Sequence, residues 1–481
     1  MIDVRPVFYA LGALLCVLSV FMLVPMLADL AFGHADASSF LISACVTAFF
    51  GVALILAFHV DDLKVDRRQG FLLTALAWLV LSGFAALPFR FSAMEMDYAA
   101  AYFESMSGLT TTGSSAIADL SIAPPGILLW RGLLNALGGA GIIVLALVML
   151  PFLSVGGMQL FRTESSDRSE KLFPRIDQIA GATIGVYSGL ILLCAFIYAA
   201  LGMEPFDAVV HAMATIATGG FGNHADSFGS YPAPILWAAT FFMACGGMPL
   251  ALFALTLNRG PRALLSDTQV RAFVMFLVVA TIMVAGWLIL VGKAPIFWSL
   301  THAAFNVVSI VTTTGFASDD YMQWGTFVVM MFLFLTAVGG CTGSTTGGPK
   351  IFRYQVLAML LRRHRNETVM PHAVNVRRYG GRPVGDDVVR AVLVLFALYG
   401  VTVISLALGL AATGLDVETS FSGALTAVSN VGPGIGDQIG PVGSFAGLSD
   451  TALWMLAFGM MVGRLEFTTV FILFSRRFWR T

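Results

Sequence analysis

The sequence has few charged residues. Asp, Glu, Lys and Arg account for only 11% of its 481 positions, whereas hydrophobic residues account for 58%. Soluble proteins average about 25% charged residues, and their surface helices carry a polar face. The shortage therefore argues against an ordinary water-soluble protein. The formal net charge of −1 gives no indication of nucleic-acid binding either.

Cysteine is also scarce, and familiar catalytic motifs are missing. The five cysteines (Cys16, Cys45, Cys194, Cys245 and Cys341) are scattered, and no pair has the spacing of a metal or redox site. No HExxH or GxSxG motif and no paired intramembrane aspartates occur. The sequence therefore predicts neither an enzyme nor a covalently bound cofactor.

Long apolar runs are what the sequence does contain. They lie near 8–31, 40–58, 71–89, 127–150, 183–202, 234–257, 273–292, 325–338, 388–412 and 451–474. Most have the roughly 20 residues that a helix needs to cross a bilayer core of about 30 Å. The first run is too long for a signal peptide and has no small-residue cleavage site. We therefore expect an all-α polytopic membrane protein with ten crossings.

The basic residues indicate the orientation of these helices. With ten crossings the termini share one side with the connections at 59–70, 151–180, 258–271 and 350–387. Of the 27 Lys and Arg residues, only Arg90, Arg131 and Lys293 fall on the opposite side, and Arg464 falls inside a helix. Because short basic loops mark the cytoplasm, we expect both termini to be cytoplasmic.

Four connections on the opposite side share a motif. Aligned on a central glycine they read FESMSGLTTTGSS (Gly113), VHAMATIATGGFG (Gly220), FNVVSIVTTTGFA (Gly315) and SGALTAVSNVGPG (Gly432). The glycines are 107, 95 and 117 residues apart, and each follows an apolar segment too short to span. A motif recurring at a regular distance indicates repeated structural units. The unit is a helix, a re-entrant pore segment and a second helix, so the four repeats are pseudo-symmetric.

These units divide the chain. We expect an N-terminal transmembrane hairpin at 1–62 and pore repeats at 63–160, 161–262, 263–385 and 386–481, the third of which contains the glycine-rich run at 339–348.

The motifs suit an ion filter. Non-helical backbone at membrane depth is tolerated only where it lines a cavity or is buried in protein. Carbonyl oxygens around a common axis can replace the hydration shell of a cation, and short helices whose C-terminal ends face that axis favour positive charge. The predicted filter residues are Thr111, Thr112, Gly113, Thr218, Gly219, Gly220, Thr313, Thr314, Gly315, Asn430, Val431 and Gly432. Simple helix breaks or small-residue packing sites are the alternative.

An acidic residue follows each motif within 4–6 positions. These residues are Asp119, Asp226, Asp319 with Asp320, and Asp437. A ring of carboxylates at a pore mouth would concentrate cations. Solvated loop acids would give the same pattern, so both readings stay open.

Two further features lie within apolar stretches. The glycine-rich run at 339–348 interrupts a helix, and it is not a phosphate loop because Gly347 is followed by Gly-Pro-Lys. Arg464 lies midway along the last apolar run, where a charge is costly and usually faces a partner or water. A simple structural kink is one reading of the glycine-rich run. A structural ion pair is one reading of Arg464. Glu466, two residues further on, does not share the helix face of Arg464.

The whole chain resembles the Trk/Ktr/HKT potassium transporter superfamily, and TrkH-type bacterial subunits within it. The resemblance rests on TTTGSS, ATGGFG, TTTGF, NVGPG and the run GGCTGSTTGGPK at 339–350. It implies a K⁺ filter with one glycine per repeat. Serine at the glycine position of the first repeat is associated with Na⁺ passage in plant relatives. In the fourth motif Asn430 and Val431 stand where threonines are expected, so its register is uncertain by a residue or two.

The resemblance also implies a gate and partners. An intramembrane loop beneath the filter would obstruct the pore, with Arg464 contacting it; the loop residues are Gly343, Ser344, Thr345, Thr346 and Gly347. A homodimer and TrkA-type nucleotide-binding regulatory subunits on the basic cytoplasmic face are implied as well. Attraction to lipid head groups is another explanation of the basic residues at 350–387.

A secondary transporter that couples a solute to H⁺ or Na⁺ is the alternative function. Such carriers usually have two inverted repeats and acidic residues near the membrane midplane. Here the motifs number four, and carboxylates within the apolar runs are scarce.

Overall fold

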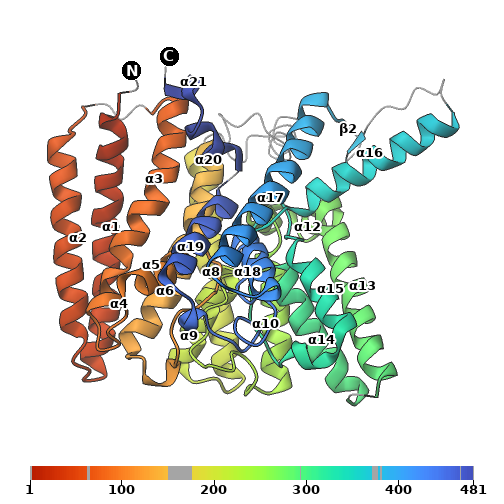
Figure 1. Ribbon diagram of the computed structural model, residues 1–481, viewed down its shortest axis with the longest axis horizontal. Coiled ribbons are helices and arrows are strands. Elements are labelled where there is room, and N and C mark those ends of the chain that lie inside the picture. Colours follow the sequence, from red (N-terminus) through yellow and green to blue (C-terminus); the bar gives the residue numbers. More distant parts are fainter. Residues whose placement is uncertain are drawn as a thin grey trace.

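The chain folds into a bundle of helices. The computed structural model describes residues 3–61, 65–149, 176–292, 294–370, 378–379, 382–465 and 467–479. The expected boundaries at 62/63 and 160/161, most of the 151–180 connection, Lys293 and Glu466 lie outside these residues. Both chain ends lie at the same edge of the bundle (Figure 1).

The helices follow the predicted order of a hairpin and four units. The hairpin is α1 (Arg5–Ala31) and α2 (Ala37–Ala57). The first unit contains α3 (Arg67–Ala85), α4 (Leu87–Phe91), α5 (Tyr98–Leu109), η1 (Leu120–Ile122) and α6 (Pro125–Met149). The second contains α8 (Ile176–Ala200), α9 (Pro205–Ile216), α10 (Ala233–Gly246), α11 (Leu250–Arg259) and α12 (Arg262–Ser266).

The third unit contains α13 (Thr268–Leu290), α14 (Ile296–Val311), η2 (Tyr321–Trp324), α15 (Thr326–Thr336), α16 (Ile351–Val369), β1 (Arg378–Tyr379) and β2 (Arg382–Pro383). The two short strands pair antiparallel, with Arg378 opposite Pro383 and Tyr379 opposite Arg382. The fourth contains α17 (Asp386–Ala412), α18 (Val417–Ser429), η3 (Phe445–Gly447), α19 (Asp450–Arg464), α20 (Phe467–Leu473) and α21 (Arg476–Trp479).

Local sequence explains where several helices begin. Asp66 and Gln69 form a reciprocal capping box at the start of α3. Asp267 caps α13 by accepting hydrogen bonds from two backbone N–H groups, and Asp416 accepts one at the start of α18. α9 begins at Pro205, whose missing N–H costs nothing at that position.

The four pore helices α5, α9, α14 and α18 are joined in a ring. Each packs against the first helix of its own unit, in the pairs α3–α5, α8–α9, α13–α14 and α17–α18. Each also packs against the helix that follows the pore segment in the preceding unit, in the pairs α19–α5, α6–α9, α10–α14 and α15–α18. Because the fourth unit thereby contacts the first, the arrangement closes on itself. This closed packing supports the predicted pseudo-symmetry.

The hairpin is attached at the side of this ring through two aspartates. Buried Asp29 accepts a hydrogen bond from the Gly126 backbone N–H at the start of α6 (2.6 Å). Asp36 accepts one from the Ala93 N–H (3.1 Å) after α4. Both contacts place a carboxylate on a backbone donor that the neighbouring helices leave unpaired.

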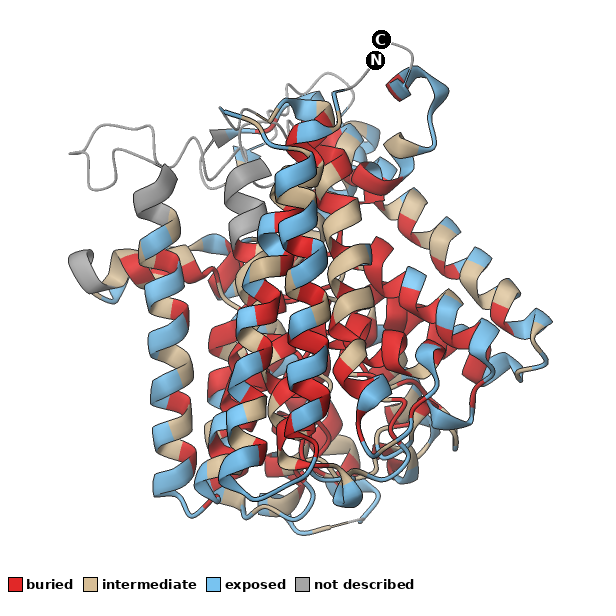
Figure 2. Ribbon diagram, turned by 90° about the vertical axis from the view of Figure 1, so that its left-hand side faces the viewer, coloured by how far each residue is buried: buried red, intermediate tan, exposed pale blue. Residues whose placement is uncertain are grey.

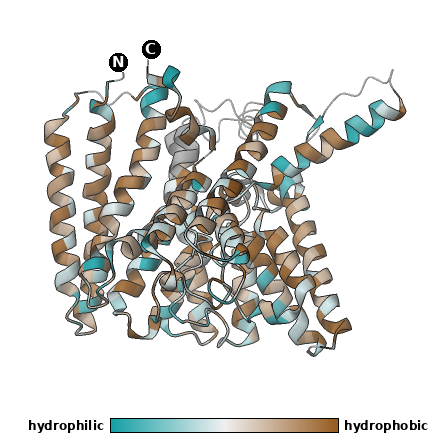
Figure 3. Cartoon of the chain, in the orientation of Figure 1, coloured by the Kyte–Doolittle hydropathy of each residue, from teal (hydrophilic) through white to brown (hydrophobic). Residues whose placement is uncertain are grey.

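The outside of the bundle is apolar. Large hydrophobic side chains are exposed along the long helices, for example Leu56, Leu192 and Leu290. Figure 2 shows exposed positions alternating with buried ones along the outer helices, and Figure 3 shows that these helices are hydrophobic along their length. Exposed apolar surface this extensive belongs in contact with lipid.

The number of unbroken crossings is smaller than the predicted ten. Among the described residues, seven helices are long and apolar enough to span a membrane, and up to nine spans result if two bent helix pairs each count as one. The predicted 325–338 span is α15, which has only 11 residues and is too short to cross alone. The chain then continues through the glycine-rich run to α16.

The predicted 234–257 and 451–474 spans are broken rather than continuous. α10 and α11 meet at an angle of 97°, because Pro249 cannot donate the backbone hydrogen bond that would continue the helix. α19 ends at Arg464 and α20 begins at Phe467. Apolar composition alone did not distinguish these broken helices from straight ones.

Candidate functional site: a ring of four pore segments and the loop beside it

The four pore helices end in the same backbone geometry. The residue two positions before each motif glycine has a left-handed conformation, with φ of 51° at Thr111, 50° at Thr218, 55° at Thr313 and 54° at Asn430. This conformation costs a non-glycine residue about 1–2 kcal/mol. The recurrence of the same unfavourable conformation at four equivalent places indicates a shared structural requirement.

Backbone hydrogen bonds repeat this geometry. In each segment the N–H of the residue before the motif glycine is bonded to the carbonyl five residues earlier. The pairs are Thr112 to Ser107, Gly219 to Ala214 and Thr314 to Ser309, all at 2.8 Å, and Val431 to Thr426 at 3.1 Å. This is the Schellman termination of a helix. It aligns Asn430 with the three threonines, so Gly432 is the structural equivalent of Gly113, and the register of the fourth motif is resolved.

The motif glycines lie together in a closed ring. A methyl group added to Gly113 would lie 2.8 Å from the carbonyl oxygen of Gly219, and one added to Gly432 would lie 2.8 Å from that of Thr112. A methyl group added to Gly220 would lie still closer to the Thr314 carbonyl oxygen, and one added to Gly315 still closer to that of Val431. Each glycine therefore abuts the residue that precedes the glycine of a neighbouring repeat.

Glycine is required at these positions for two reasons. All four have positive φ, between 73° and 106°, a region that side chains disfavour. The close approach to a neighbouring carbonyl also leaves no room for a Cβ atom. The structure thus brings together all four predicted filter glycines with their preceding residues, in one ring of backbone carbonyls and glycine Cα atoms.

The four left-handed side chains differ in their partners. Thr218 Oγ1 donates to its neighbour's carbonyl and lies 3.2 Å from the hydroxyl of Thr345. Thr313 Oγ1 accepts a hydrogen bond from the Gly347 N–H (2.7 Å). Within the described part of the chain, the buried Thr111 Oγ1 and Asn430 Oδ1 have no hydrogen-bond partner. Two neutral oxygens at equivalent positions are therefore available to water or to an ion.

The other predicted threonine oxygens face the helix ends. Thr112 Oγ1 pairs with the hydroxyl of Thr110, and Thr314 Oγ1 pairs with that of Thr312, each at 2.8 Å. Asn430 Nδ2 also donates to Thr112 Oγ1 (3.0 Å). These hydroxyls therefore stabilise the turn at the end of each pore helix.

The glycine-rich run lies against this ring. It separates α15 from α16, as the sequence predicted. Thr345 is fully buried, and its hydroxyl donates to the carbonyls of Ile216 (3.0 Å) and Gly246 (3.1 Å). Together with the contacts to Thr218 and Thr313, these bonds place the loop directly beside the C-terminal ends of the pore helices.

The break between α10 and α11 holds the loop. The Cys341 N–H donates to the Gly247 carbonyl (2.9 Å), and the Leu250 N–H donates to the Gly343 carbonyl (3.2 Å). Backbone groups freed by the bend are thereby satisfied by the loop, which a membrane environment demands. Lys350, at the end of the run, donates to the Thr346 hydroxyl (2.8 Å).

Arg464 contacts the loop at its most buried residue. Its Nη1 donates to the Thr345 carbonyl oxygen at 2.9 Å, and the residue is only 6% exposed. Within the described residues its Nε and Nη2 atoms have no hydrogen-bond partner. The contact that the sequence resemblance implied is present, and Nη1 bonds to a carbonyl oxygen rather than to a carboxylate.

Comparisons with known proteins agree with this geometry. A family model described as the TrkH cation transport protein matches residues 37–480. The chain belongs to the TrkH family.

Relatives and a solved structure match over the full length. The chain is 45% identical to the Trk system potassium uptake protein TrkI of Halomonas elongata, over 99% of this chain and 97% of that protein. It is 34% identical to the Trk system potassium uptake protein TrkH of Escherichia coli, over 99% of each. The crystal structure of the potassium transporter TrkH from Vibrio parahaemolyticus superposes with a TM-score of 0.92 at 33% identity, covering 100% of both chains.

The acidic residues after the motifs are tied into local turns of this TrkH family member. Asp119 accepts hydrogen bonds from the side chain and backbone of Ser121, which lower the pKa of its carboxyl. Asp320 caps η2, Asp319 accepts from Trp324, and Asp226 accepts from Ser230. These contacts hold the carboxylates in place, and the acidic ring at the pore mouth stays a prediction.

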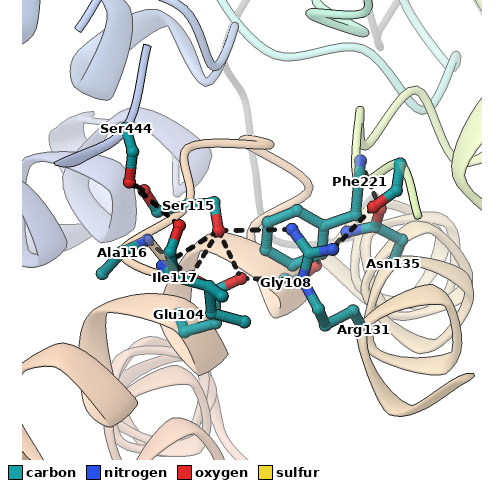
Figure 4. A network of polar contacts seen from close by, with 10 residues as sticks. Glu104, Gly108, Ser115, Ala116, Ile117, Arg131, Asn135, Phe221 and Ser444 are labelled. Atoms are coloured by element: carbon teal, nitrogen blue, oxygen red, sulfur yellow. Dashed lines mark hydrogen bonds and ion pairs between the residues drawn. The ribbon is translucent and has the colours of Figure 1, made fainter. Parts of the chain in front are cut away.

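Sequence reasoning missed one group of residues behind the ring. Buried Glu104 on α5 pairs with buried Arg131 on α6 (2.8 Å), close to the segment that follows the first motif (Figure 4). Arg131 stood out in the sequence only as a rare basic residue on the non-cytoplasmic side. A carboxylate within an apolar pore helix was the available signal, and no spacing rule connected it to a residue 27 positions away.

Proposed function

We propose that this TrkH family member takes up K⁺ across the bacterial inner membrane through a filter formed by its four pore segments. The closed ring of Gly113, Gly220, Gly315 and Gly432 is the observation that carries this proposal. Four equivalent segments whose backbone carbonyls crowd together can replace the hydration shell of a bare cation. The relatives named as potassium uptake proteins support K⁺ as that cation.

The environment of the ring suits a cation of low charge density. The carboxyl ends of four helices meet there, and their partial negative charge attracts cations. The side-chain oxygens at the four left-handed positions belong to three threonines and one asparagine, so they are neutral. Neutral oxygens suit K⁺, whereas a divalent ion would call for carboxylates. Among the described residues no cluster of three or more His, Cys, Asp or Glu suited to a metal was found.

The loop at 339–348 is proposed as the gate. Its Thr345 and Gly347 are bonded to two of the four left-handed residues, Thr218 and Thr313, so an ion that leaves the ring on this side meets the loop. Five glycines in the run allow it to change conformation without side-chain strain. Arg464 would hold the loop in the position observed.

Orientation and partners complete the proposal. Arg362, Arg363 and Arg365 lie on α16, at the edge of the bundle where both termini lie (Figure 1). Basic residues concentrated on one side mark that side as cytoplasmic. We expect a homodimer, and a TrkA-type nucleotide-binding subunit docked on this cytoplasmic face that moves the gate.

Complementation and reconstitution test the function. The gene should restore growth at low K⁺ to a bacterium that lacks K⁺ uptake, and the purified protein should carry K⁺ and Rb⁺ into liposomes faster than Na⁺. The alternative, a carrier that couples a solute to H⁺ or Na⁺, draws support from the bent α10–α11 pair. Solute uptake without growth rescue would favour the carrier and reject the channel-like pore.

A further inference from the structure

A polar side chain behind each pore segment bonds to the same backbone position. In each repeat, a residue nine or ten positions before the motif glycine accepts a hydrogen bond from the N–H of the residue three positions after that glycine. The pairs are Ala116 N to Glu104 Oε2 (2.7 Å), Asn223 N to His211 Nε2 (3.5 Å), Ser318 N to Asn306 Oδ1 (3.3 Å) and Ile435 N to Ser422 Oγ (3.0 Å).

The four acceptors differ chemically but share their burial. Glu104, His211 and Asn306 are fully buried, and Ser422 is 3% exposed. A buried acceptor is oriented by its other bonds, and each of these has one. Glu104 pairs with Arg131. The remaining three orienting contacts are His211 Nδ1 with the Asp207 carbonyl, Asn306 Nδ2 with the His302 carbonyl, and Ser422 Oγ with the Ile435 carbonyl.

Among these four acceptors, only Glu104 in the first repeat is oriented by an ion pair. Arg131 Nε donates to Glu104 Oε1 (2.8 Å), and both residues are almost fully buried. Arg131 Nη1 donates to the carbonyl of Gly222 (2.6 Å), and its guanidinium lies 4.2 Å from the centre of the Phe221 ring. Gly222 and Phe221 follow the motif glycine of the second repeat. The pair therefore joins the segments that leave the ring in repeats one and two.

We propose that Glu104, His211, Asn306 and Ser422 form a positioning layer that holds the extended backbone of the filter at a spacing suited to K⁺, with Arg131 coupling the first repeat to the second. The proposal rests on the proposed K⁺ uptake and adds which residues set its selectivity. The backbone just beyond each glycine has no strand partner, so these side chains supply the bond that fixes it.

The charged pair makes the first segment the most firmly held. Hydrogen bonds to ionised groups are shorter and about twice as strong as neutral ones, and the 2.7 Å bond of Glu104 is the shortest of the four. Arg131 contacts two repeats through one rigid planar group. A filter whose backbone is held in this way cannot contract around the smaller Na⁺ ion without breaking these bonds.

The test uses purified full-length variants in liposomes of Escherichia coli polar lipids. The variants are Asn306→Ala, Ser422→Ala and the double change Glu104→Gln with Arg131→Gln, which leaves no unpaired buried charge. Asp29→Asn is the matched control, since Asp29 is also fully buried and also accepts a backbone N–H bond (2.6 Å) but belongs to the hairpin. The readouts are the K⁺ to Na⁺ uptake ratio, the K⁺ concentration for half-maximal uptake, and the melting temperature.

We expect the K⁺ to Na⁺ ratio to fall about fivefold for each single pore variant, the equivalent of one hydrogen bond of about 1 kcal/mol, and further for the double variant. Asp29→Asn should lower the melting temperature and leave the ratio unchanged. If Asn306→Ala and Ser422→Ala keep the wild-type ratio and half-saturation, the positioning role is overturned even if they are less stable. A wild-type protein that transports no K⁺ would instead overturn the proposed function itself, and the positioning role with it.

Discussion

Replacing Arg464 with alanine should raise K⁺ flux through the unpartnered protein. Arg464 Nη1 donates to the Thr345 carbonyl at 2.9 Å, and Thr345 in turn is bonded to the pore segment of repeat two. A hydrogen bond from a charged donor contributes about 1.5–3 kcal/mol. If this bond exists only when the loop is closed, its loss shifts the closed-to-open ratio by about 10- to 150-fold.

Fold stability should change much less than gating does. A guanidinium that is 6% exposed, with two nitrogens lacking partners among the described residues, is poorly compensated for its lost hydration. Its removal therefore relieves a desolvation cost that offsets the lost bond. A raised flux with an almost unchanged melting temperature is the expected signature, and it separates a gating effect from partial unfolding.

The assay is ⁸⁶Rb⁺ uptake into liposomes that contain equal amounts of protein and no regulatory subunit. Arg476→Ala is the control, because Arg476 is an exposed arginine on α21 near the C-terminus and has no expected role in the gate. Arg464→Lys, which keeps the charge and one donor, should give an intermediate flux. Wild-type uptake by Arg464→Ala would refute the assignment of Arg464 to the gate.

Three other changes have expected outcomes. Gly113→Ser should reduce the K⁺ to Na⁺ uptake ratio about 5- to 150-fold. The reason is a strain of about 1–3 kcal/mol, because φ is 89° at Gly113 and the new Cβ would lie 2.8 Å from the Gly219 carbonyl oxygen. An unaltered ratio would argue against the ring as the filter. Thr345→Val should raise basal flux about fivefold through loss of its hydroxyl bonds, measured as for Arg464. Neutralising the acids after the motifs should lower conductance at low salt and have little effect at about 1 M salt. A variant whose conductance equals that of the wild type at both salt concentrations would identify them as ordinary loop acids. These acids are Asp119, Asp226, Asp319, Asp320 and Asp437.

The sequence predicted the membrane-helical fold and the family because both depend on local patterns. Apolar runs depend on composition, and the four glycine motifs depend on a backbone conformation that each segment adopts on its own. Even the departure at Asn430 is explained locally, since asparagine tolerates the left-handed conformation that Thr111 adopts at the equivalent position. These predictions are confirmed at the level of fold and family, whereas the roles of the filter and gate residues remain predictions.

Other features were beyond reach of the sequence because they depend on contacts between distant segments. The bond from Arg131 to Gly222 joins residues 91 positions apart, and no periodicity predicts it. The bend after Gly246 also went unrecognised, although Pro249 was a local signal for it. At the bend, the loop supplies donors to the Gly246 and Gly247 carbonyls, which the broken helix leaves unpaired. A run of apolar residues does not predict which distant segment supplies such hydrogen-bond donors.

On the proposed gating role, the hydrogen bonds of the loop set the free energy needed to open the pore. Four hydrogen bonds join the loop to the pore segments and to α19: from Thr218 to Thr345, from Thr345 to the Ile216 carbonyl, from Gly347 to Thr313 and from Arg464 to Thr345. The three neutral bonds contribute about 1 kcal/mol each and the charged one about 1.5–3 kcal/mol. Their sum is comparable to the roughly 5.5 kcal/mol of differential binding needed to move an equilibrium from 1:99 to 99:1. A cytoplasmic partner that bound the open form more tightly by that amount would therefore suffice to open the pore, and no covalent energy input at the loop is required.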